Sequence, residues 1–432
     1  MDRRGFIKAS ALAGVSFMLD WEKAFALGKS DKAVSKPWKG WKQGHFQVHS
    51  IYTGVAESMF MIFPDGTSML LDCGDHDALG RGKLAVPVLP SPERHSGEWI
   101  ARYVERVNPN RREVDYMMLS HYHHDHAGEP HFHAGKIVRD GEEYALSGFP
   151  HAAERLTFRN AVDRAWPLYN DPLPMPDDYQ GDIVRHIRSF YKRMEARHGM
   201  RIEKFRVGET GQIRLLHNPR RYPGFSVRNL CGNGRIAAPD GTVTDLYADW
   251  IASGGQPLNE NGMSLGIVIS YDGFRFYTAG DFCDTITRSD GSTMDIEEEL
   301  ARVCGPVHVA KINHHGHYSM PAALVSALRP RVWFSCVWDQ LHNVAPVMER
   351  LSDRKLYPGE RVICPGIFPA ERRAEDAGAP WLDDIAGPCF DGAHFVLDVP
   401  PGGKHYSVSL LDARDESMTV RSVMRFEADR LE

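Results

Sequence analysis

The stretch Ser120-His121-Tyr122-His123-His124-Asp125-His126-Ala127-Gly128 decides how this sequence is interpreted. It follows the apolar segment 114–119, which has the pattern of a strand, and it ends at a glycine. We therefore expect it to form a loop at the edge of a sheet. Imidazole nitrogens and a carboxylate oxygen gathered in one loop are ligands that a borderline cation such as Zn²⁺ binds. A solvated histidine-rich loop is the alternative, but this spacing directly after an apolar strand rarely arises by chance.

The composition around this stretch is that of an ordinary globular protein. The chain has 432 residues, of which 42% are hydrophobic and 25% charged, and this excludes a disordered chain or a small scaffold. A formal net charge of -6 argues against a surface that coats nucleic acid or membrane, so we expect no stable nucleic-acid complex. Seven scattered cysteines without a CxxC pair predict neither a disulfide scaffold nor a thiolate zinc site.

The first 27 residues have the pattern of an export signal. Arg3 and Arg4 precede a mildly apolar stretch over 9–19, and small residues follow at 24–26. This resembles a twin-arginine signal peptide, which would direct the folded protein to the periplasm, and we assign it to residues 1–27. An amphipathic helix of a cytoplasmic protein is the alternative. The apolar stretch is too short to span a bilayer and no longer one follows, so we expect no integral membrane segment.

Hydrophobic periodicity predicts a mixture of strands and helices from residue 44 onward. We expect strands over 46–52, 58–63, 68–71, 114–119, 264–270, 274–278, 307–312, 332–337, 361–364, 394–399 and 405–411, and helices over 96–107, 179–198, 294–303 and 321–328. The turn Pro64-Asp65-Gly66 predicts a hairpin between the second and third strands. Periodicity alone supports either an α/β or an α+β fold.

We expect one large domain over residues 44–411, followed by a C-terminal extension over 412–432. The region 129–255 is rich in proline, arginine and histidine and shows few clear strands. We therefore interpret it as a long insertion into the domain rather than as a separate domain.

The histidine motif resembles HxHxDH, the signature of the metallo-β-lactamase fold superfamily, through His121, His123, Asp125 and His126. Three further segments resemble the family pattern in the same order: Leu70-Leu71-Asp72-Cys73-Gly74, Thr278-Ala279-Gly280-Asp281 and Lys311-Ile312-Asn313-His314-His315-Gly316. The resemblance covers about residues 44–365. It implies an α+β fold, namely a four-layer αββα sandwich, which is interrupted here by the long insertion.

Within this superfamily the pattern resembles the soluble hydrolase domain of bacterial competence (DNA-uptake) channel proteins. The matching segments are Asn261-Gly262-Met263-Ser264-Leu265, His314-His315-Gly316 and Leu341-His342-Asn343. Two positions depart from the family pattern, since His317 replaces a serine and Asn343 replaces a proline. These departures bear on the substrate more than on the fold.

The resemblance implies a centre of two metal ions, for which we expect Zn²⁺, with Mn²⁺ or Fe²⁺ as alternatives. It assigns as ligands His121 and His123 to the first ion, Asp125, His126 and either His315 or His314 to the second, and Asp281 as the bridge. A water shared by two divalent cations has its pKa lowered toward about 7, which produces hydroxide at neutral pH. A third histidine for the first ion is not identified, because none of the remaining candidates lies in a recognisable motif: His131, His133, His151 and His217.

Four residues are candidates for supporting roles. Asp125 would also orient the hydroxide. His342 and Lys311 would stabilise negative charge on a phosphoryl or carbonyl oxygen, although a structural or solvated role fits Lys311 equally well. Asp72 would fix a ligand imidazole by accepting its other N–H, and a carboxylate that caps a turn is the alternative.

These residues favour a metal-dependent hydrolase that acts on a phosphodiester or other phosphoester in a small-molecule or polymeric anionic substrate. Hydrolysis of a lactam, lactone or thioester is the alternative, because the same hydroxide attacks either kind of centre. A non-catalytic metal-binding protein that uses residues 129–255 to bind a partner is a third hypothesis. Asp125 and Asp281 argue against it, since a decayed site would lose acidic ligands early. The sequence indicates no oligomeric state.

Overall fold

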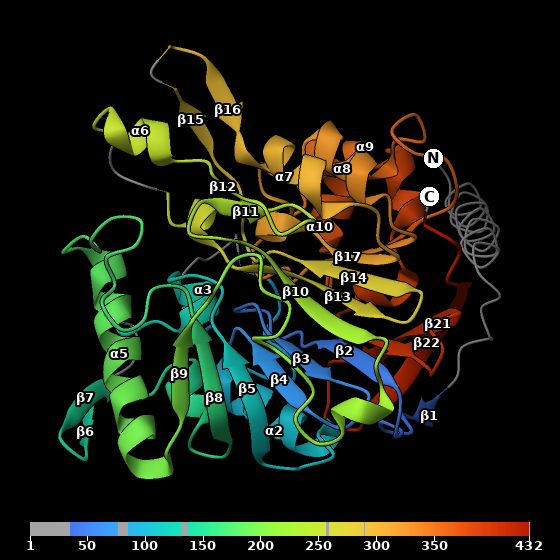
Figure 1. Cartoon of the computed structure of the whole chain (residues 1–432). Coiled ribbons are helices and arrows are strands. Elements are labelled where there is room, and N and C mark those ends of the chain that lie inside the picture. Colours follow the sequence, from blue (N-terminus) through green and yellow to red (C-terminus); the bar gives the residue numbers. More distant parts are fainter. Residues whose placement is uncertain (1–34, 77–84, 132–135, 256–258, 289, 432) are drawn as a thin grey trace, which may run out of the picture.

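A computed structural model describes residues 35–76, 85–131, 136–255, 259–288 and 290–431. The predicted signal segment 1–27 lies outside these residues. Two large sheets form the centre of the molecule, and Figure 1 shows them one above the other. Helices lie above the upper sheet and below the lower one, so the described chain has the mixed helix and strand content that its sequence predicts.

The first sheet has ten strands in the order β1-β22-β21-β20-β2-β3-β4-β5-β8-β9. Their bounds are β1 (Lys36–Pro37), β2 (Phe46–Ser50), β3 (Met59–Ile62), β4 (Ser68–Leu71), β5 (Glu113–Met118), β8 (Thr157–Asp163), β9 (Arg201–Lys204), β20 (Ala393–Val399), β21 (His405–Asp412) and β22 (Thr419–Glu427). The predicted hairpin is confirmed, since β3 and β4 are antiparallel and its turn has Gly66 at a φ of +90°. From β4 to β9 the strands run parallel.

The second sheet has eight strands in the order β12-β11-β10-β13-β14-β17-β18-β19. Their bounds are β10 (Phe225–Gly232), β11 (Arg235–Ala237), β12 (Val243–Asp245), β13 (Gly266–Tyr271), β14 (Phe274–Thr278), β17 (Val309–Lys311), β18 (Val332–Phe334) and β19 (Val362–Cys364). The strands β14, β17, β18 and β19 run parallel. Two small hairpins lie outside both sheets, and they are formed by β6 (Lys136–Arg139) with β7 (Glu142–Ala145) and by β15 (Thr285–Thr287) with β16 (Thr293–Asp295).

Nine α-helices are present in the described residues. Their bounds are α2 (Ser96–Val107), α3 (His124–Ala127), α4 (Phe149–Ala152), α5 (Tyr179–His198), α6 (Ala248–Ala252), α7 (Ile296–Cys304), α8 (Ala322–Leu328), α9 (Ala345–Ser352) and α10 (Ala370–Glu375). Short 3₁₀ turns are η2 (Pro219–Arg221), η3 (Asn261–Met263), η4 (Asn313–Gly316), η5 (Pro380–Asp384) and η6 (Gly387–Phe390). The two longest helices, α2 and α5, have the bounds that the sequence predicts.

Alternating side chains explain how the layers pack. Met61 of β3 belongs to the same hydrophobic cluster as Phe276 of β14, so this face of the first sheet packs against the second sheet. Its neighbour Phe60 points to the opposite face and packs in a cluster with Ile100 of α2. Full burial of one such side chain contributes roughly 2 kcal/mol. The core therefore fixes how the two sheets face each other, and with it the positions of the loops at their edges.

The region 129–255 contributes more strand than the predicted insertion would. It supplies β8 and β9 to the first sheet and β10, β11 and β12 to the second. These strands are hard to recognise because β9, β11 and β12 are only three or four residues long, and the side chains of β9 are mostly exposed. The region is thus part of both sheets rather than an addition outside them.

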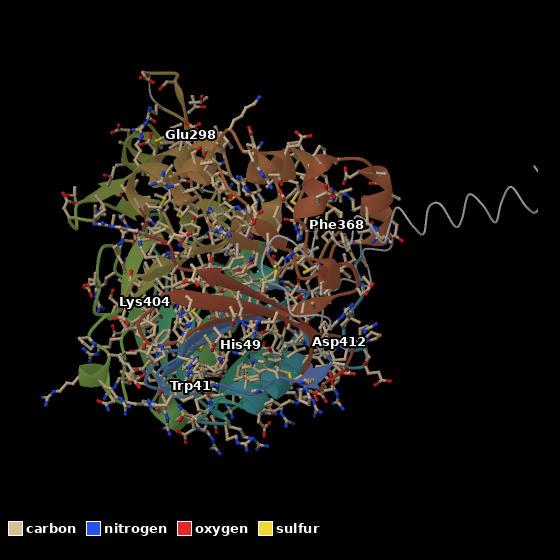
Figure 2. The ribbon with its side chains drawn as sticks, turned by 90° about the vertical axis from the view of Figure 1, so that its right-hand side faces the viewer. Trp41, His49, Glu298, Phe368, Lys404 and Asp412 are labelled. Atoms are coloured by element: carbon tan, nitrogen blue, oxygen red, sulfur yellow. The ribbon has the colours of Figure 1, made fainter. Side chains whose placement is uncertain are left out.

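The segment 412–432, expected to be an extension, also belongs to the fold. It contains β22, which pairs along most of its length with β21. Figure 2 shows these C-terminal strands crossing one side of the molecule between Lys404 and Asp412. None of the helices in the described part of the chain combines the length and the apolarity that a bilayer span requires.

Candidate metal centre

The residues of the histidine motif lie where the ends of five strands meet. Asp72 follows β4, the motif 121–126 follows β5, Asp281 follows β14, and the loop 313–316 follows β17. The segment 335–343 follows β18. Because the carboxyl ends of parallel strands lie at one edge of a sheet, residues distant in the sequence are brought together. The two sheets pack so that the strand ends of the first sheet lie close to those of the second.

His126 shows why a cation fits this place. Its Nδ1 lies 2.7 Å from Asp72 Oδ2, so this nitrogen donates to the carboxylate. Its Nε2 lies 3.2 Å from Asp281 Oδ2 and 3.3 Å from Asp125 Oδ2, and although burial opposes a charge on the ring, these carboxylates raise the pKa of His126. In the neutral ring, Nε2 would carry a lone pair. A lone pair that faces two carboxylates is unfavourable unless a positive charge lies among them.

His315 repeats this arrangement from the other sheet. Its Nδ1 donates to the Cys336 carbonyl oxygen at 2.9 Å. Its Nε2 lies 3.0 Å from Asp125 Oδ2 and 3.2 Å from Asp281 Oδ2. Burial opposes a charge on this ring, but the Asp281 and Asp125 carboxylates raise the pKa of His315 to about 9. The carboxylates therefore attract either a proton or a metal ion to Nε2.

The four atoms have the spacing of ligands around one metal ion. The separations between the imidazole Nε2 atoms and the carboxylate Oδ2 atoms fall between 3.0 and 3.3 Å. Ligands at the usual zinc distances of about 2.0–2.2 Å lie about 3.4 Å apart in a tetrahedron. All four residues are at least nine-tenths buried, so solvent screens their charges only weakly. The donor set therefore fits a divalent cation.

His121 and His123 form a second pair beside this group. His121 Nε2 lies 3.0 Å from His123 Nδ1 and 4.0 Å from Asp281 Oδ2. The Asp281 carboxylate is thus a member of the four-atom group and also lies near this pair. Burial and the neighbouring His126 lower the pKa of His121, which favours the neutral ring that binds metal.

Asp72 is held in place by Ser120, the second residue after β5. It accepts from the Ser120 backbone N–H and from the Ser120 hydroxyl, each at 2.7 Å, and it is completely buried. Its contact to His126 is the one expected of a carboxylate that orients a ligand imidazole. Gly74 allows this close approach, because a Cβ at that position would collide with the Asp125 carbonyl oxygen.

Lys311 is completely buried, and it does not line the cavity beside the four-atom group. Its Nζ lies 3.0 Å from Glu57 Oε2 and donates to the Gly280 carbonyl oxygen at 2.8 Å. These contacts exclude the solvated alternative for Lys311 and agree with the structural one. Glu57 also lies 3.4 Å from His315 Nδ1 and belongs to a group of possible ligands with His126, Asp281 and His315.

The loop after β17 separates the two adjacent histidines. His314 and His315 both have positive φ, of 47° and 50°, so their side chains leave the loop in different directions. His315 points to the carboxylates, whereas His314 Nε2 lies 3.3 Å from Asn261 Nδ2 and its Nδ1 lies 3.3 Å from Cys283 Sγ. The geometry thus brings His315, and not His314, into the four-atom group.

A cavity of about 350 Å³ opens beside the group. Its wall is formed mainly by polar side chains: His123, His124, Asp125, Gln180, Asp281, His314, His315, His317, Trp338, Asp339, Leu341 and His342. The His342 ring stacks on His315 with centroids 4.6 Å apart. Trp338 donates from Nε1 to Asp125 Oδ2 at 2.9 Å. The cavity is large enough for a small substrate that reaches the group.

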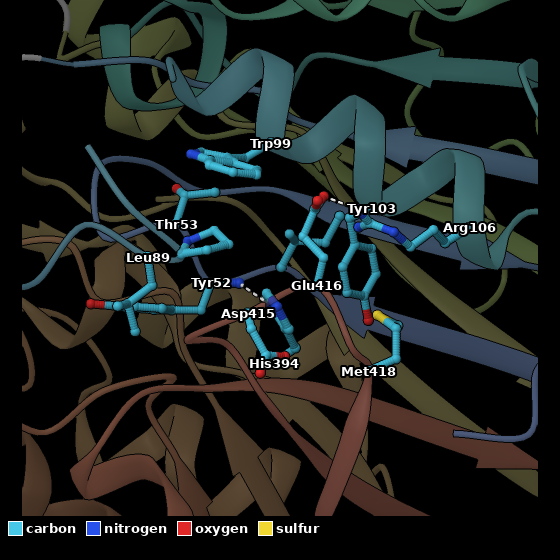
Figure 3. A pocket seen from close by; sticks show the side chains of 12 residues that line it. Tyr52, Thr53, Leu89, Trp99, Tyr103, Arg106, His394, Asp415, Glu416 and Met418 are labelled. Carbon is cyan, nitrogen blue, oxygen red and sulfur yellow. Dashed lines mark hydrogen bonds and ion pairs between the residues drawn. The ribbon is translucent and has the colours of Figure 1, made fainter. Parts of the chain in front are cut away.

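A second, much smaller cavity of about 20 Å³ lies between α2 and the C-terminal strands. Figure 3 shows Tyr103, His394 and Met418 around it, with an interaction between the Tyr52 backbone and His394. Such a volume holds about one water molecule. We therefore assign no substrate to it.

The remaining histidines considered as ligands lie elsewhere or outside the described residues. His131 pairs with Asp182 at 2.8 Å and His217 with Asp115 at 3.1 Å, both away from the cavity wall. His151 is partly buried next to His95, and His133 lies outside the described residues. Of these four candidates, the three that lie in the described residues are thus not brought to the pair formed by His121 and His123.

Comparison with known proteins agrees with this geometry over part of the chain. Residues 52–129 match the family model of the metallo-beta-lactamase superfamily. This segment is therefore similar to the metallo-beta-lactamase superfamily. It contains Asp72 and the histidine motif, whereas Asp281 and His315 lie beyond it. No curated protein matches the chain, so the narrower resemblance to competence-type hydrolases remains a prediction.

Three residues of the centre are not identified by the sequence reasoning. Glu57 precedes β3, Gln180 lies in the first turn of α5, and Trp338 follows β18. None belongs to a short motif, and each contacts a residue more than fifty positions away: Lys311 for Glu57, His123 for Gln180 and Asp125 for Trp338. The one available signal is Glu57, an isolated acid within the otherwise apolar and neutral stretch 51–63.

Proposed function

We propose that the protein is a hydrolase of phosphodiesters or other phosphoesters with a centre of two zinc ions. One observation carries this proposal. The Nε2 atoms of His126 and His315 lie 3.0–3.3 Å from carboxylate Oδ2 atoms of Asp125 and Asp281. In both rings the other nitrogen already contacts an acceptor, Asp72 for His126 and Cys336 for His315. The arrangement therefore resembles a prepared metal site rather than a hydrogen-bond network.

We assign the ligands according to this geometry. His121 and His123 would hold the first ion, Asp125, His126 and His315 the second, and Asp281 would bridge them. The layers seen in Figure 1 support a four-layer αββα sandwich around this centre. Mn²⁺ or Fe²⁺ would use the same nitrogen and oxygen ligands.

Two divalent cations bound here would supply hydroxide at neutral pH and polarise the oxygen of the attacked centre. The chain itself orients the reactants. Asp125, fixed by Trp338, presents its carboxylate at the cavity wall, where it would orient the nucleophile. His342 Nδ1 accepts from the Trp338 backbone N–H at 3.4 Å, so a neutral ring carries its proton on Nε2. That N–H would donate to a phosphoryl or leaving-group oxygen.

The cavity wall favours an anionic, oxygen-rich substrate. Outside the proposed ligand set, His317, His342 and Gln180 line this wall with N–H groups that can donate, whereas Asp125 and Asp281 face the proposed metal ions and Asp339 is a third acid of the wall. A phosphoester presents several oxygen acceptors to such donors, while a lactam or lactone presents a single carbonyl oxygen. This difference is our reason for placing phosphoesters first.

Metal analysis and a substrate panel test the proposal. The purified full chain should retain at least two divalent ions, and it should hydrolyse bis(p-nitrophenyl) phosphate in preference to a lactam or a lactone. Asp281→Ala should lose bound metal and at least about 100-fold of the activity, since even changes outside the ligand set cost 10–100-fold. Asp284→Asn, three residues along the same segment, is the matched control and should retain both. A metal-free active protein, or a preference for lactams, would contradict the proposal.

We also propose that the chain is exported through the twin-arginine route. The proposal rests on Arg3 and Arg4, the apolar stretch over 9–19 and the small residues at 24–26. A folded, metal-loaded protein is compatible with this route. N-terminal sequencing of the periplasmic form should find a start close after Ala26, and an intact Met1 in that fraction would contradict cleavage.

A further inference from the structure

A second group of potential metal ligands lies beside the proposed centre. His76, His124 and Glu129 place one ligand atom each within 4.8 Å of one another. Glu129 is buried, and the two histidines are partly buried. The proposed function gives none of these three residues a role. We propose that they form a third divalent-cation site, with two imidazoles and one carboxylate as ligands.

Backbone hydrogen bonds hold the three residues together. The His124 carbonyl oxygen accepts from the backbone N–H of Asp75 at 3.1 Å and from that of Gly128 at 2.9 Å. Asp75 precedes His76 and Gly128 precedes Glu129, so one carbonyl group anchors both neighbouring chain segments. The backbone around α3 therefore fixes where the three side chains start.

The side chains are also oriented by their surroundings. The His76 ring lies 4.1 Å from the His124 ring and 5.0 Å from the Trp338 ring, measured between centroids. Glu129 Oε1 accepts from the His131 backbone N–H at 3.0 Å, and the Glu129 backbone N–H donates to Ser147 Oγ at 2.7 Å. These contacts restrict both the imidazole pair and the carboxylate.

The donor set selects the kind of cation. Two imidazoles and one carboxylate are a common ligand set for Zn²⁺ and similar borderline cations, and they leave one position open. Zinc ligands in a tetrahedron lie about 3.4 Å apart, so small side-chain rotations would close a group that spans up to 4.8 Å. A histidine pair that only packs against Trp338 is the alternative, and it would bind no metal.

The proposed third site would act on the same cavity as the centre. His124 lines the cavity of about 350 Å³, together with Asp125 and Trp338. A cation on His124 would add positive charge to this wall and strengthen its attraction for an anionic substrate. The site itself does not depend on the proposed function, because it shares no ligand with the centre.

Zinc binding by the full chain tests the proposal. The metal-free protein is dialysed against Zn²⁺ in the presence of a chelator of micromolar affinity, and the retained ions are counted by mass spectrometry. Wild type should retain one ion more than His76→Gln and one more than Glu129→Gln. His95→Gln is the matched control, because His95 lies near Asp75 but outside the group, and it should retain the wild-type number.

The variants also separate this site from the centre. Asp281→Ala should lose ions of the centre and still retain the ion that His76→Gln removes. If wild type retains one ion that is lost in His76→Gln but kept in Asp281→Ala, the third site stands and the two-metal function fails. Equal numbers of ions with equal affinity in wild type, His76→Gln and Glu129→Gln would overturn the third site. Circular dichroism confirms that each counted variant is folded, and either variant alone decides the outcome.

Discussion

Each imidazole that faces the carboxylates of the centre is oriented through its second ring nitrogen. Asp72 accepts from His126, and the Cys336 carbonyl accepts from His315. These contacts choose the tautomer in which Nε2 is available for a metal ion. The acceptors come from the strand ends of different sheets, so ligand orientation depends on residues outside the histidine motif.

Replacing Asp72 tests this orientation. In Asp72→Asn the amide group cannot accept from both Ser120 donors and from His126 Nδ1, so the ring loses its fixed tautomer. We expect metal affinity to fall roughly 10–100-fold, measured by competition with a chelator. Asp398→Asn is the control, because it disturbs a similar pair with His45 that lies away from the cavity. Unchanged affinity in Asp72→Asn would show that His126 needs no such partner.

A buried ion pair supports the centre from behind. Lys311 and Glu57 are completely buried, and Nζ lies 3.0 Å from Oε2. Burial opposes the charge on Lys311, but the Glu57 and Asp281 carboxylates raise its pKa, so the amine stays protonated. Removing one partner of such a pair leaves the other charge without compensation, which costs more than removing both.

We therefore expect Lys311→Met to lower the free energy of unfolding by about 3–5 kcal/mol, as measured in urea. The double variant Lys311→Met with Glu57→Gln should recover much of this loss, since it removes both charges of the pair. Lys355→Met, at an exposed lysine outside the centre, is the control and should change little. Equal losses in the single and double variants would mean that the ion pair is not the source of the effect.

The sequence identifies those residues of the centre that directly follow predicted strands. His121, Asp125 and Asp281 are found in this way, because a short motif and a strand end coincide. The choice between His314 and His315 was not predictable, since it depends on two positive φ angles in the loop. Gln180 was not predictable either, because only the tertiary fold brings α5 to His123.

Among the elements, α7 supports the loop that carries His315. Glu297 in its first turn is buried and accepts from Asn313 Nδ2 at 2.9 Å and from the Met320 backbone N–H at 3.0 Å. Burial raises the pKa of Glu297 to about 8. In the unfolded chain the pKa of a glutamate is about 4.3. The folded state therefore keeps a proton that the unfolded state releases between these values.

This difference predicts how stability depends on pH. Where the folded state binds more protons, the free energy of unfolding falls as pH rises. The contribution of Glu297 should thus be present below about pH 4 and lost as pH increases through about 8. We expect thermal unfolding of Glu297→Gln to be less dependent on pH between 5 and 9 than that of wild type. Glu298→Gln, exposed on the same helix, should follow wild type. An identical pH dependence in Glu297→Gln would contradict a buried, protonated Glu297.

Helices and strands with a clear pattern in their own sequence could be predicted. Strands that form only because they pair with a neighbouring strand could not. The hairpin of β3 and β4 has a turn tripeptide, and α2 has one apolar face, so both follow from local sequence. The four residues of β9 are mostly exposed and contain three charged side chains. Their strand conformation comes from parallel pairing with β8, which local sequence does not reveal.

At the scale of the whole molecule, the proposed centre joins the two sheets. Asp125 and His126 follow a strand of the first sheet, whereas Asp281 and His315 follow strands of the second. The buried carboxylates of Asp125 and Asp281, one from each sheet, both face the Nε2 atoms of His126 and His315. Bound metal would therefore stabilise the packing of the sheets as well as the site.

Metal removal should accordingly destabilise the entire fold. Metal that binds only the folded chain stabilises it by about 2.7 kcal/mol when the free ion is at 100 times its Kd. We expect dialysis against a chelator to lower the melting temperature of wild type, and re-addition of Zn²⁺ to restore it. Asp281→Ala, which lacks the bridging carboxylate, should show a smaller shift between the two conditions, while Asp284→Asn should behave like wild type. Equal melting temperatures of wild type with and without chelator would mean that no cation joins the sheets, because a bound ion that links both must be lost on unfolding.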